Sequence, residues 1–239
     1  MKKPILSIVL MFSIVLSFSA CISFHNEDDT PTSSEVAETG TPTTDTESSA
    51  DSFEYVRFGT YEQDGDLENG AEPIIWIVLE EKDGKLLLIS TYILDYQDFN
   101  DTTIARGISW ENCSLREWLN NDFYNSAFSE TEKQMILTTE VQDYNSDNVP
   151  CGTTADKVFL LNKDQAFSYF SNDEDRATRS TAYARSQKSY VTNSYWLINS
   201  YDSTDLYKYL INSEGRNENN PRVNESEGIR PVIWVSVES

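Results

Sequence analysis

The chain has 239 residues, enough for one domain with a sizeable hydrophobic core or for two very small domains. Its content of aromatic (12%) and hydrophobic (38%) residues is typical of a globular protein, and 40 acidic against 18 basic residues give a formal net charge of −22. Such a chain repels phosphate backbones and lacks the Lys/Arg clusters that release counterions, so nucleic acid is excluded as a partner.

The first 20 residues have the layout of a secretory signal peptide. Two lysines are followed by an apolar run over 5–15 and by small residues up to Cys21. The final four letters, FSAC, resemble the bacterial lipobox, whose cysteine receives a diacylglyceryl group and becomes the new N-terminus. We predict that 1–20 is removed and that Cys21 is lipidated, which would hold the protein on the extracytoplasmic face of the cell membrane. The alternative is an ordinary signal peptidase site.

The next segment, 21–52, is predicted to be a disordered tether. Residues 22–52 contain eight acidic side chains, many Ser and Thr, and almost no large apolar residue. Such a segment cannot bury enough surface to offset the entropy lost on ordering. His25, the one histidine of the chain, lies here. Catalysis by Ser-His-Asp or Cys-His groups and histidine zinc sites are therefore excluded for the rest of the chain.

Residues 53–239 are predicted to form a single globular domain that starts with a hairpin. Two β-rich runs, 74–80 and 85–91, are separated by a turn that contains Asp-Gly. The acidic loop 64–70 before them allows a calcium interpretation, but it lacks the glycine and the bidentate glutamate of an EF-hand loop. We therefore expect a solvated turn there and no bound metal.

The stretch SWENCSLREWLNNDFY over 109–124 predicts a helix. Ser114 and Glu117 have the spacing of a capping box, and apolar residues follow at helical spacing. Aromatic residues on such a stripe are usually core, and neighbouring residues such as Arg116 and Glu117 point in different directions. The stretch is therefore interpreted as a structural element of the fold and not as an active site. The residues expected to be buried are Leu115, Trp118, Leu119 and Phe123.

Two further short helices are expected. One begins at a second capping-box signature, Ser129 and Glu132. The other begins at Asn162, after the strand-like run 157–161. The first helix carries Met135 and Ile136, and the second buries Phe167 and Phe170.

The last third of the chain contains two strand-like runs, 194–200 and 228–236. Strands at this position, after helices in the middle, favour an α+β fold over repeated βαβ units. Residues 201–227 between them are predicted to be a long polar loop region, where binding tends to reside. If a ligand surface exists, it should draw on the loops between 171 and 227 with Trp196 beside it. The alternative is that Trp196 belongs to the core.

Cys113 and Cys151 are predicted to form a disulfide. Export would place both in an oxidising compartment, and they form an even pair once Cys21 carries the lipid. The alternative is two separate thiols, Cys113 buried at a helix start and Cys151 exposed in a loop.

Several blocks of this sequence occur in the order seen in a domain-of-unknown-function family. The blocks include FGTYEQDGD, PIIWIVLEEKDGKLLLIS, SLREWLNNDFY, DKVFLL and GIRPVIWV, and the likeness covers 53–236. The chain resembles this family, whose members are secreted proteins and lipoproteins of mostly Gram-positive anaerobes. The resemblance implies a fold and a location more than an activity.

A weaker resemblance concerns the fold. An early hairpin, short helices, a strand with Trp-Leu and a closing GIRPV strand are similar to the C-type-lectin-like fold, including its formylglycine-generating-enzyme branch. That enzyme branch uses paired cysteines near the C-terminal end, whereas no cysteine follows Cys151. The enzymatic role is therefore not transferred to this chain.

The sequence thus favours an extracytoplasmic, membrane-anchored lipoprotein with a non-catalytic module that binds a glycan or a surface protein and needs no cofactor. The alternatives are a carboxylate-dependent envelope hydrolase, such as a glycosidase, and a structural envelope protein. Arg230 is a second candidate for the ligand side, although an arginine at a buried strand edge more often pairs with a carboxylate.

Overall fold

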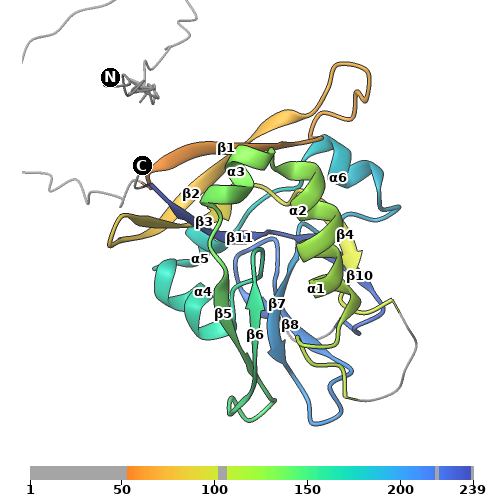
Figure 1. Cartoon of the computed structure of the whole chain (residues 1–239). Coiled ribbons are helices and arrows are strands. Elements are labelled where there is room, and N and C mark those ends of the chain that lie inside the picture. The colour runs from red at the N-terminus through yellow and green to blue at the C-terminus, as the bar shows by residue number, and fades with distance from the viewer. Residues whose placement is uncertain (1–52, 102–106, 219–220, 238–239) are drawn as a thin grey trace, which may run out of the picture. The chain divides into compact units, whose positions relative to one another are not determined.

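An antiparallel four-stranded sheet contains the hairpin expected from the sequence (Figure 1). Its strands are β1 (Tyr55–Tyr61), β2 (Glu72–Lys82), β3 (Lys85–Ser90) and β11 (Val232–Ser236), in the order β1-β2-β3-β11. The predicted hairpin is β2–β3, and it turns at Asp83 and Gly84, whose φ angles are 50° and 67°. The computed structural model describes residues 53–101, 107–218 and 221–237, and all of these belong to one compact unit. The predicted signal peptide and tether, with Cys21 and His25, lie outside the described residues.

A second sheet has five strands. Its order is β4-β10-β7-β8-β9. The strands are β4 (Asp95–Asp98), β7 (Tyr195–Ser200), β8 (Lys208–Ile211), β9 (Asn217–Glu218) and β10 (Ser226–Ile229). The strand predicted over 194–200 is confirmed as β7, which is buried along its whole length. The prediction of a loop throughout 201–227 is wrong, because β8, β9 and the first two residues of β10 fall within it.

The strand predicted over 228–236 is in fact two strands in two different sheets. Arg230 and Pro231 separate β10 in the five-stranded sheet from β11 in the four-stranded sheet. Proline has no backbone N–H to donate to a ladder, so the run cannot continue as one strand through this position. A single segment therefore joins the two sheets.

A two-stranded ribbon, β5 (Thr139–Tyr144) with β6 (Pro150–Asp156), was not expected from the sequence. It lies beside the β7–β8 hairpin at the end of the domain away from β1 and β2 (Figure 1). The strand expected over 157–161 is reduced to one bridge between Phe159 and Val232.

A helical stretch with a π-helical turn in its middle runs from residue 114 to 127. It comprises α1 (Ser114–Trp118), the π turn η1 (Leu119–Phe123) and α2 (Tyr124–Ala127). The predicted Ser114–Glu117 capping box is wrong, because the N-cap is Cys113, whose sulfur accepts the Arg116 N–H at 3.4 Å. The Ser114 hydroxyl accepts instead from the backbone N–H of Asp101, at 2.9 Å.

The apolar stripe of this stretch is buried except at Trp118. Leu115, Leu119 and Phe123 are at most 1% exposed, whereas Trp118 is half-buried and contacts Phe123 with ring centroids 5.7 Å apart. Leu115, Leu119 and Phe123 follow one another at a spacing of four residues, which places them on the same face of the helical stretch. The prediction that Trp118 is buried is therefore only partly correct.

The remaining helices are short and begin at side-chain caps. They are α3 (Glu130–Met135), α4 (Lys163–Tyr169), α5 (Asp173–Arg176) and α6 (Ala182–Ser186). The predicted starts at Ser129 and Asn162 are confirmed, each as a full capping box. Phe170 is buried as expected, but Phe167 is 42% exposed and stacks on Arg176.

Helices and strands together form an α+β fold, as predicted. α2 packs on β1 and α1 packs on β4, so the helical stretch joins the two sheets from one side. In the ranges that the structure covers, no helix combines the length and apolar composition needed to cross a bilayer.

Candidate functional site

Two hollows open on either side of α1. One has a volume of about 480 Å³ and lies against β6; we call it the Arg116 hollow. The other has a volume of about 650 Å³ and lies against β4; we call it the Asp98 hollow. Glu117 and Asn121 line both. The stretch interpreted as a structural element therefore also borders two hollows that are large enough to hold a small ligand.

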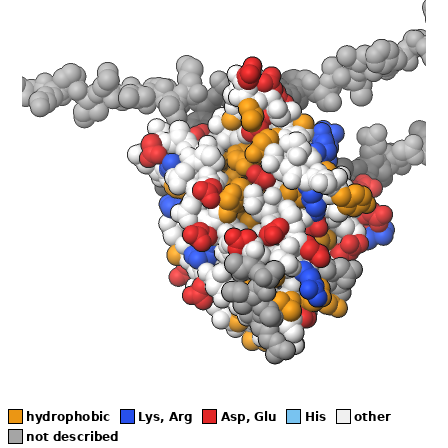
Figure 2. All heavy atoms as spheres, turned by 90° about the vertical axis from the view of Figure 1, so that its right-hand side faces the viewer, with side chains coloured by type: hydrophobic (Ala, Val, Ile, Leu, Met, Phe, Trp, Pro, Cys, Tyr) orange, Lys and Arg blue, Asp and Glu red, His pale blue; other side chains and the backbone are white. Residues whose placement is uncertain are grey.

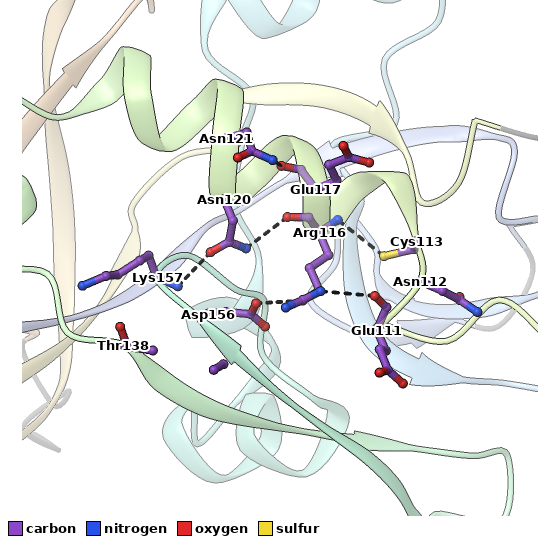
Figure 3. Close-up of a pocket in the computed structure, with 11 residues that line it drawn as sticks. Glu111, Asn112, Cys113, Arg116, Glu117, Asn120, Asn121, Thr138, Asp156 and Lys157 are labelled. Carbon is purple, nitrogen blue, oxygen red and sulfur yellow. Dashed lines mark hydrogen bonds and ion pairs between the residues drawn. The ribbon is translucent and has the colours of Figure 1, made fainter.

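The polar groups of the Arg116 hollow hold one another (Figure 3). The Arg116 Nε donates to Asp156 Oδ1 at 2.7 Å, and its Nη1 donates to the Glu111 carbonyl at 3.2 Å. The Asp156 carboxylate is 1% exposed and also accepts from the Trp110 indole at 2.9 Å and the Thr154 hydroxyl at 2.6 Å. These groups bond to one another and stabilise the fold. This agrees with the interpretation of residues 109–124 as a structural element.

Asn120, on another wall of the Arg116 hollow, is also held by hydrogen bonds inside the protein. Its Nδ2 donates to the carbonyls of Arg116 and Val158, and its Oδ1 accepts from the backbone N–H groups of Lys157 and Val158. Figure 3 shows this amide between α1 and the segment that carries Lys157. All four of its hydrogen-bonding positions are thus used inside the protein. Asn120 therefore fixes the helix to this segment.

The Asp98 hollow differs from the Arg116 hollow in that its acidic side chains are not held by other groups of the described residues. Asp98, Asp101, Glu117 and Asp122 all line it, together with Trp118. Within the described ranges, none of these four carboxylates forms a hydrogen bond or an ion pair, and the Trp118 indole N–H has no acceptor. Polar groups at the wall of a hollow that bind nothing inside the protein remain available to a ligand.

The electrostatics of the Asp98 hollow follow from this crowding of acids. Partial burial and the neighbouring Asp101 carboxylate raise the pKa of Asp98, and Lys188 opposes the shift. Lys188 is itself engaged by the Glu227 carboxylate at 3.3 Å and lies over the Tyr96 ring at 5.0 Å. Figure 2 shows Asp and Glu side chains across the middle of the face that carries α1, β4 and β10. The hollow is electronegative and would repel anionic ligands.

Trp196 does not lie beside a ligand surface. Its side chain is 1% exposed, the indole N–H donates to the Gln97 carbonyl at 2.9 Å, and the ring meets Phe99 edge-on at 5.7 Å. β7 is the central strand of its sheet, and all six of its residues are buried, so side chains on both of its faces are covered. The assignment of Trp196 to the ligand side is therefore wrong, and the alternative of a core residue is correct.

The predicted disulfide is not formed. Cys113 is a buried free thiol at the N-cap of α1, and Cys151 is an exposed free thiol in β6. Burial raises the pKa of Cys113 to about 12, so this thiol stays protonated and unreactive at neutral pH.

The acidic loop 64–70 is built as a turn. Its carboxylates accept backbone N–H groups of their own loop, as Asp64 does from Asp66 at 2.7 Å and Glu72 does from Gln63 at 2.7 Å. Glu62, Asp64 and Glu72 have carboxylate oxygens within 4.8 Å of one another. These hydrogen bonds stabilise the turn, and this role explains why the three acids lie close together.

The Asp98 hollow could not be predicted from the sequence, because its walls come from separate parts of the chain. Asp98 ends β4, Glu117 and Trp118 belong to α1, and Ser226 begins β10. The available signal was the acid-rich segment DYQDFND (95–101), in which carboxylates follow directly on a short buried strand.

A family model described as a domain of unknown function (DUF6273) matches residues 83–237. No curated protein and no solved structure matches the chain. The family match covers well over half of the sequence, including the five-stranded sheet, the strands β3 and β11 of the four-stranded sheet, and both hollows beside α1. The chain belongs to the DUF6273 family.

Proposed function

We propose that this protein is a non-catalytic glycan-binding module and that the Asp98 hollow is its binding site. The observation that carries the proposal is the set of uncommitted groups in that hollow: four carboxylates and the indole of the half-buried Trp118. Sugar hydroxyls donate hydrogen bonds to carboxylates, and an indole ring offers an apolar face to the C–H side of a sugar ring. The negative charge favours neutral or amino sugars over acidic ones.

The proposal extends to location and architecture. The FSAC motif and the apolar run before it support a lipoprotein on the extracytoplasmic face, as does the resemblance to secreted lipoproteins of Gram-positive anaerobes. The early hairpin, the short helices and the closing strands support a C-type-lectin-like architecture. A disordered tether over 21–52 would carry the site away from the membrane.

Binding is tested with the full chain in detergent micelles against immobilised neutral, amino and acidic glycans. We expect binding to a neutral or amino glycan, and we expect Asp98→Asn and Glu117→Gln each to weaken it about tenfold, because the acceptor loses the negative charge that strengthens its hydrogen bond. Glu111→Gln is the matched control, since Glu111 lines only the Arg116 hollow. Wild-type affinity in both hollow variants, or no binding to any glycan, would contradict the proposal.

A glycosidase is the second candidate, and one observation favours it. Asp98 combines a raised pKa with a neighbouring carboxylate, Asp101, which is the environment of an acid–base pair in glycoside hydrolysis. Incubating the same glycans with the full chain and measuring released reducing ends separates the two candidates. Turnover that Asp98→Asn abolishes would assign the protein to the enzymes, whereas binding without turnover supports the module.

Lipidation at Cys21 is a separate prediction. Mass spectrometry of the protein extracted from membranes should show a diacylglyceryl group on an N-terminal cysteine, and Cys21→Ala should move the protein to the soluble fraction because the acyl chains supply the anchor. Cys151→Ala, a change at an exposed thiol, should leave the fractionation unchanged. A Cys21→Ala protein that stays entirely with membranes would show that another element anchors it.

A further inference from the structure

Arg230 is a buried guanidinium without a carboxylate beside it. Its side chain is among the largest that are fully buried. Its Nε donates to the Ser90 carbonyl at 2.8 Å, and its Nη1 donates to the Arg176 carbonyl at 3.3 Å and to the Tyr195 hydroxyl at 3.2 Å. None of the ion pairs among the described residues includes Arg230. The carboxylate pairing expected for this strand-edge arginine is therefore not formed.

The charge of Arg230 cannot be removed by losing a proton. A buried lysine can become neutral, and burial indeed lowers the pKa of Lys208, another cation of this domain without an ion pair. A guanidinium remains protonated in any protein environment, so its charge has to be balanced by other groups. Carbonyl dipoles and the faces of Phe170 and Tyr195, at 5.0 and 5.3 Å, stabilise it in part. An anion would complete the balance.

A hollow of about 390 Å³ reaches this guanidinium; we call it the Arg230 hollow. Two polar groups on its wall have no partner within the described part of the chain: the Nη2 of Arg230 and the Thr91 hydroxyl, whose oxygen is buried. Phe53, Tyr55 and Ile77 supply apolar wall. A buried cation, a buried hydroxyl without a partner and an apolar wall form a site for a small anionic group.

A second hollow of about 380 Å³ adjoins the Arg230 hollow, since Tyr92 and Arg179 line both. Arg179 lies over the Tyr92 ring at 5.1 Å, and Arg185 lines the second hollow. Neither Arg179 nor Arg185 forms an ion pair in the ranges that the structure describes. Three arginines without acid partners thus gather here, although the chain carries more than twice as many acidic as basic residues.

Acids also border these two hollows, but most of them are engaged. Asp64 accepts from Asp66 and Asn69, and Asp175 accepts from the Asn172 amide at 2.8 Å. Glu174 is exposed. Their charges therefore lie on groups that serve the local turns or face solvent, and none of them reaches the guanidinium of Arg230.

We propose that the Arg230 hollow binds the carboxylate of a small ligand, about the size of one sugar or one or two amino-acid residues. A carboxylate oxygen would accept from the Nη2 of Arg230 and from the Thr91 hydroxyl, and Arg179 would add a second cation at the rim. Two sources offer this chemistry: the uronic acids of acidic glycans and the free C-terminus of a peptide. The site is independent of the Asp98 hollow, whose acids repel carboxylates.

Calorimetric titration of the full chain in detergent micelles, at pH 7 and constant ionic strength, tests the proposal. The probes are glucuronate with its methyl ester, and N-acetyl-alanyl-alanine with its amide. We expect one of the two carboxylates to bind and its uncharged counterpart to give no heat, and which carboxylate binds identifies the source. Equal binding of a carboxylate and its counterpart, or no binding of either carboxylate, overturns the proposal.

Variants locate the site. Arg179→Gln should weaken carboxylate binding about fivefold, because a charge-assisted contact at an exposed rim is lost without disturbing the core. Thr91→Val should weaken it as well. Arg222→Gln is the matched control: Arg222 is exposed, lies over Tyr207 at 5.5 Å and donates to its hydroxyl, as Arg179 does with Tyr92, but lines neither hollow.

An equal loss in Arg179→Gln and Arg222→Gln would show that only the general charge of the surface matters, which contradicts the proposal. Asp98→Asn should leave carboxylate binding intact. If Asp98→Asn abolishes it, the ligand occupies the other hollow and the Arg230 site is refuted. Failure of neutral glycans to bind leaves this test unaffected, because the two sites use different residues.

Discussion

Replacing Asp156 by alanine is expected to lower the free energy of unfolding by about 3–5 kcal/mol, because it removes the acid of a buried ion pair. The Asp156 carboxylate is 1% exposed and accepts hydrogen bonds from Arg116, Trp110 and Thr154. Its removal leaves a guanidinium, an indole N–H and a hydroxyl without their acceptor at the junction of α1 with β6. Urea denaturation of the full chain, followed by tryptophan fluorescence, measures the change.

Asp147→Ala is the control for this experiment. Asp147 is an exposed acid in the turn between β5 and β6, and its carboxylate forms no bond with the described residues. It should change the stability by less than about 0.5 kcal/mol, as surface substitutions usually do. Equal denaturation midpoints for Asp156→Ala and the unaltered protein would mean that the hydrogen bonds of Asp156 in the Arg116 hollow do not stabilise the fold.

The second large effect is expected at Gly215, where alanine should destabilise the fold by about 3–5 kcal/mol through backbone strain and a steric clash. The φ angle of Gly215 is +77°, and an added Cβ would lie 1.7 Å from the Asp173 carbonyl oxygen. The Gly215 carbonyl also accepts from Arg176, so a displaced turn would release this buried arginine. Thermal unfolding by circular dichroism measures the loss.

Gly65→Ala separates the two causes. Gly65 has a similar φ angle of +88°, but an added Cβ would meet nothing within 4 Å. Its substitution therefore reports the conformational cost alone, about 1 kcal/mol. If Gly215→Ala is no more damaging than Gly65→Ala, the turn at Gly215 relaxes freely and the clash carries no energy.

The elements predicted correctly from the sequence are those determined by local chemistry. The hairpin β2–β3 follows from an Asp-Gly turn between apolar runs, and the starts of α3 and α4 follow from capping boxes at Ser129 and Asn162. Each signal acts within about four residues. Tertiary contacts reinforce such signals and rarely overrule them.

The predictions that were wrong concern elements whose structure is determined by contacts with residues distant in the sequence. Ser114 lies three residues before Glu117, as an N-cap residue would, but its hydroxyl accepts from the backbone N–H of Asp101. The sulfur of Cys113 caps the helix instead. The apolar run 228–236 reads as one strand, although Pro231 divides it between two sheets. Periodicity reports which residues prefer burial but does not identify the sheet that buries them.

The same limit applies to the candidate site. Trp118 and Trp196 are each followed by leucine and look equivalent in the sequence. Trp196 is buried in the central strand β7, where its ring contacts Phe99, whereas Trp118 lies at the border of the Asp98 hollow. The acids of that hollow come from β4, the loop after it, α1 and η1, so only the folded chain brings them together.

The segment 226–236 makes each sheet depend on the other. β10 fills an interior position between β4 and β7, and β11 covers the edge of β3. Until this segment is in place, β4 has no neighbour and the apolar β3 presents open backbone groups to any passing strand. A nascent chain therefore needs protection from aggregation until this segment has been synthesised, and a protease that cuts at Arg230 would open both sheets at once.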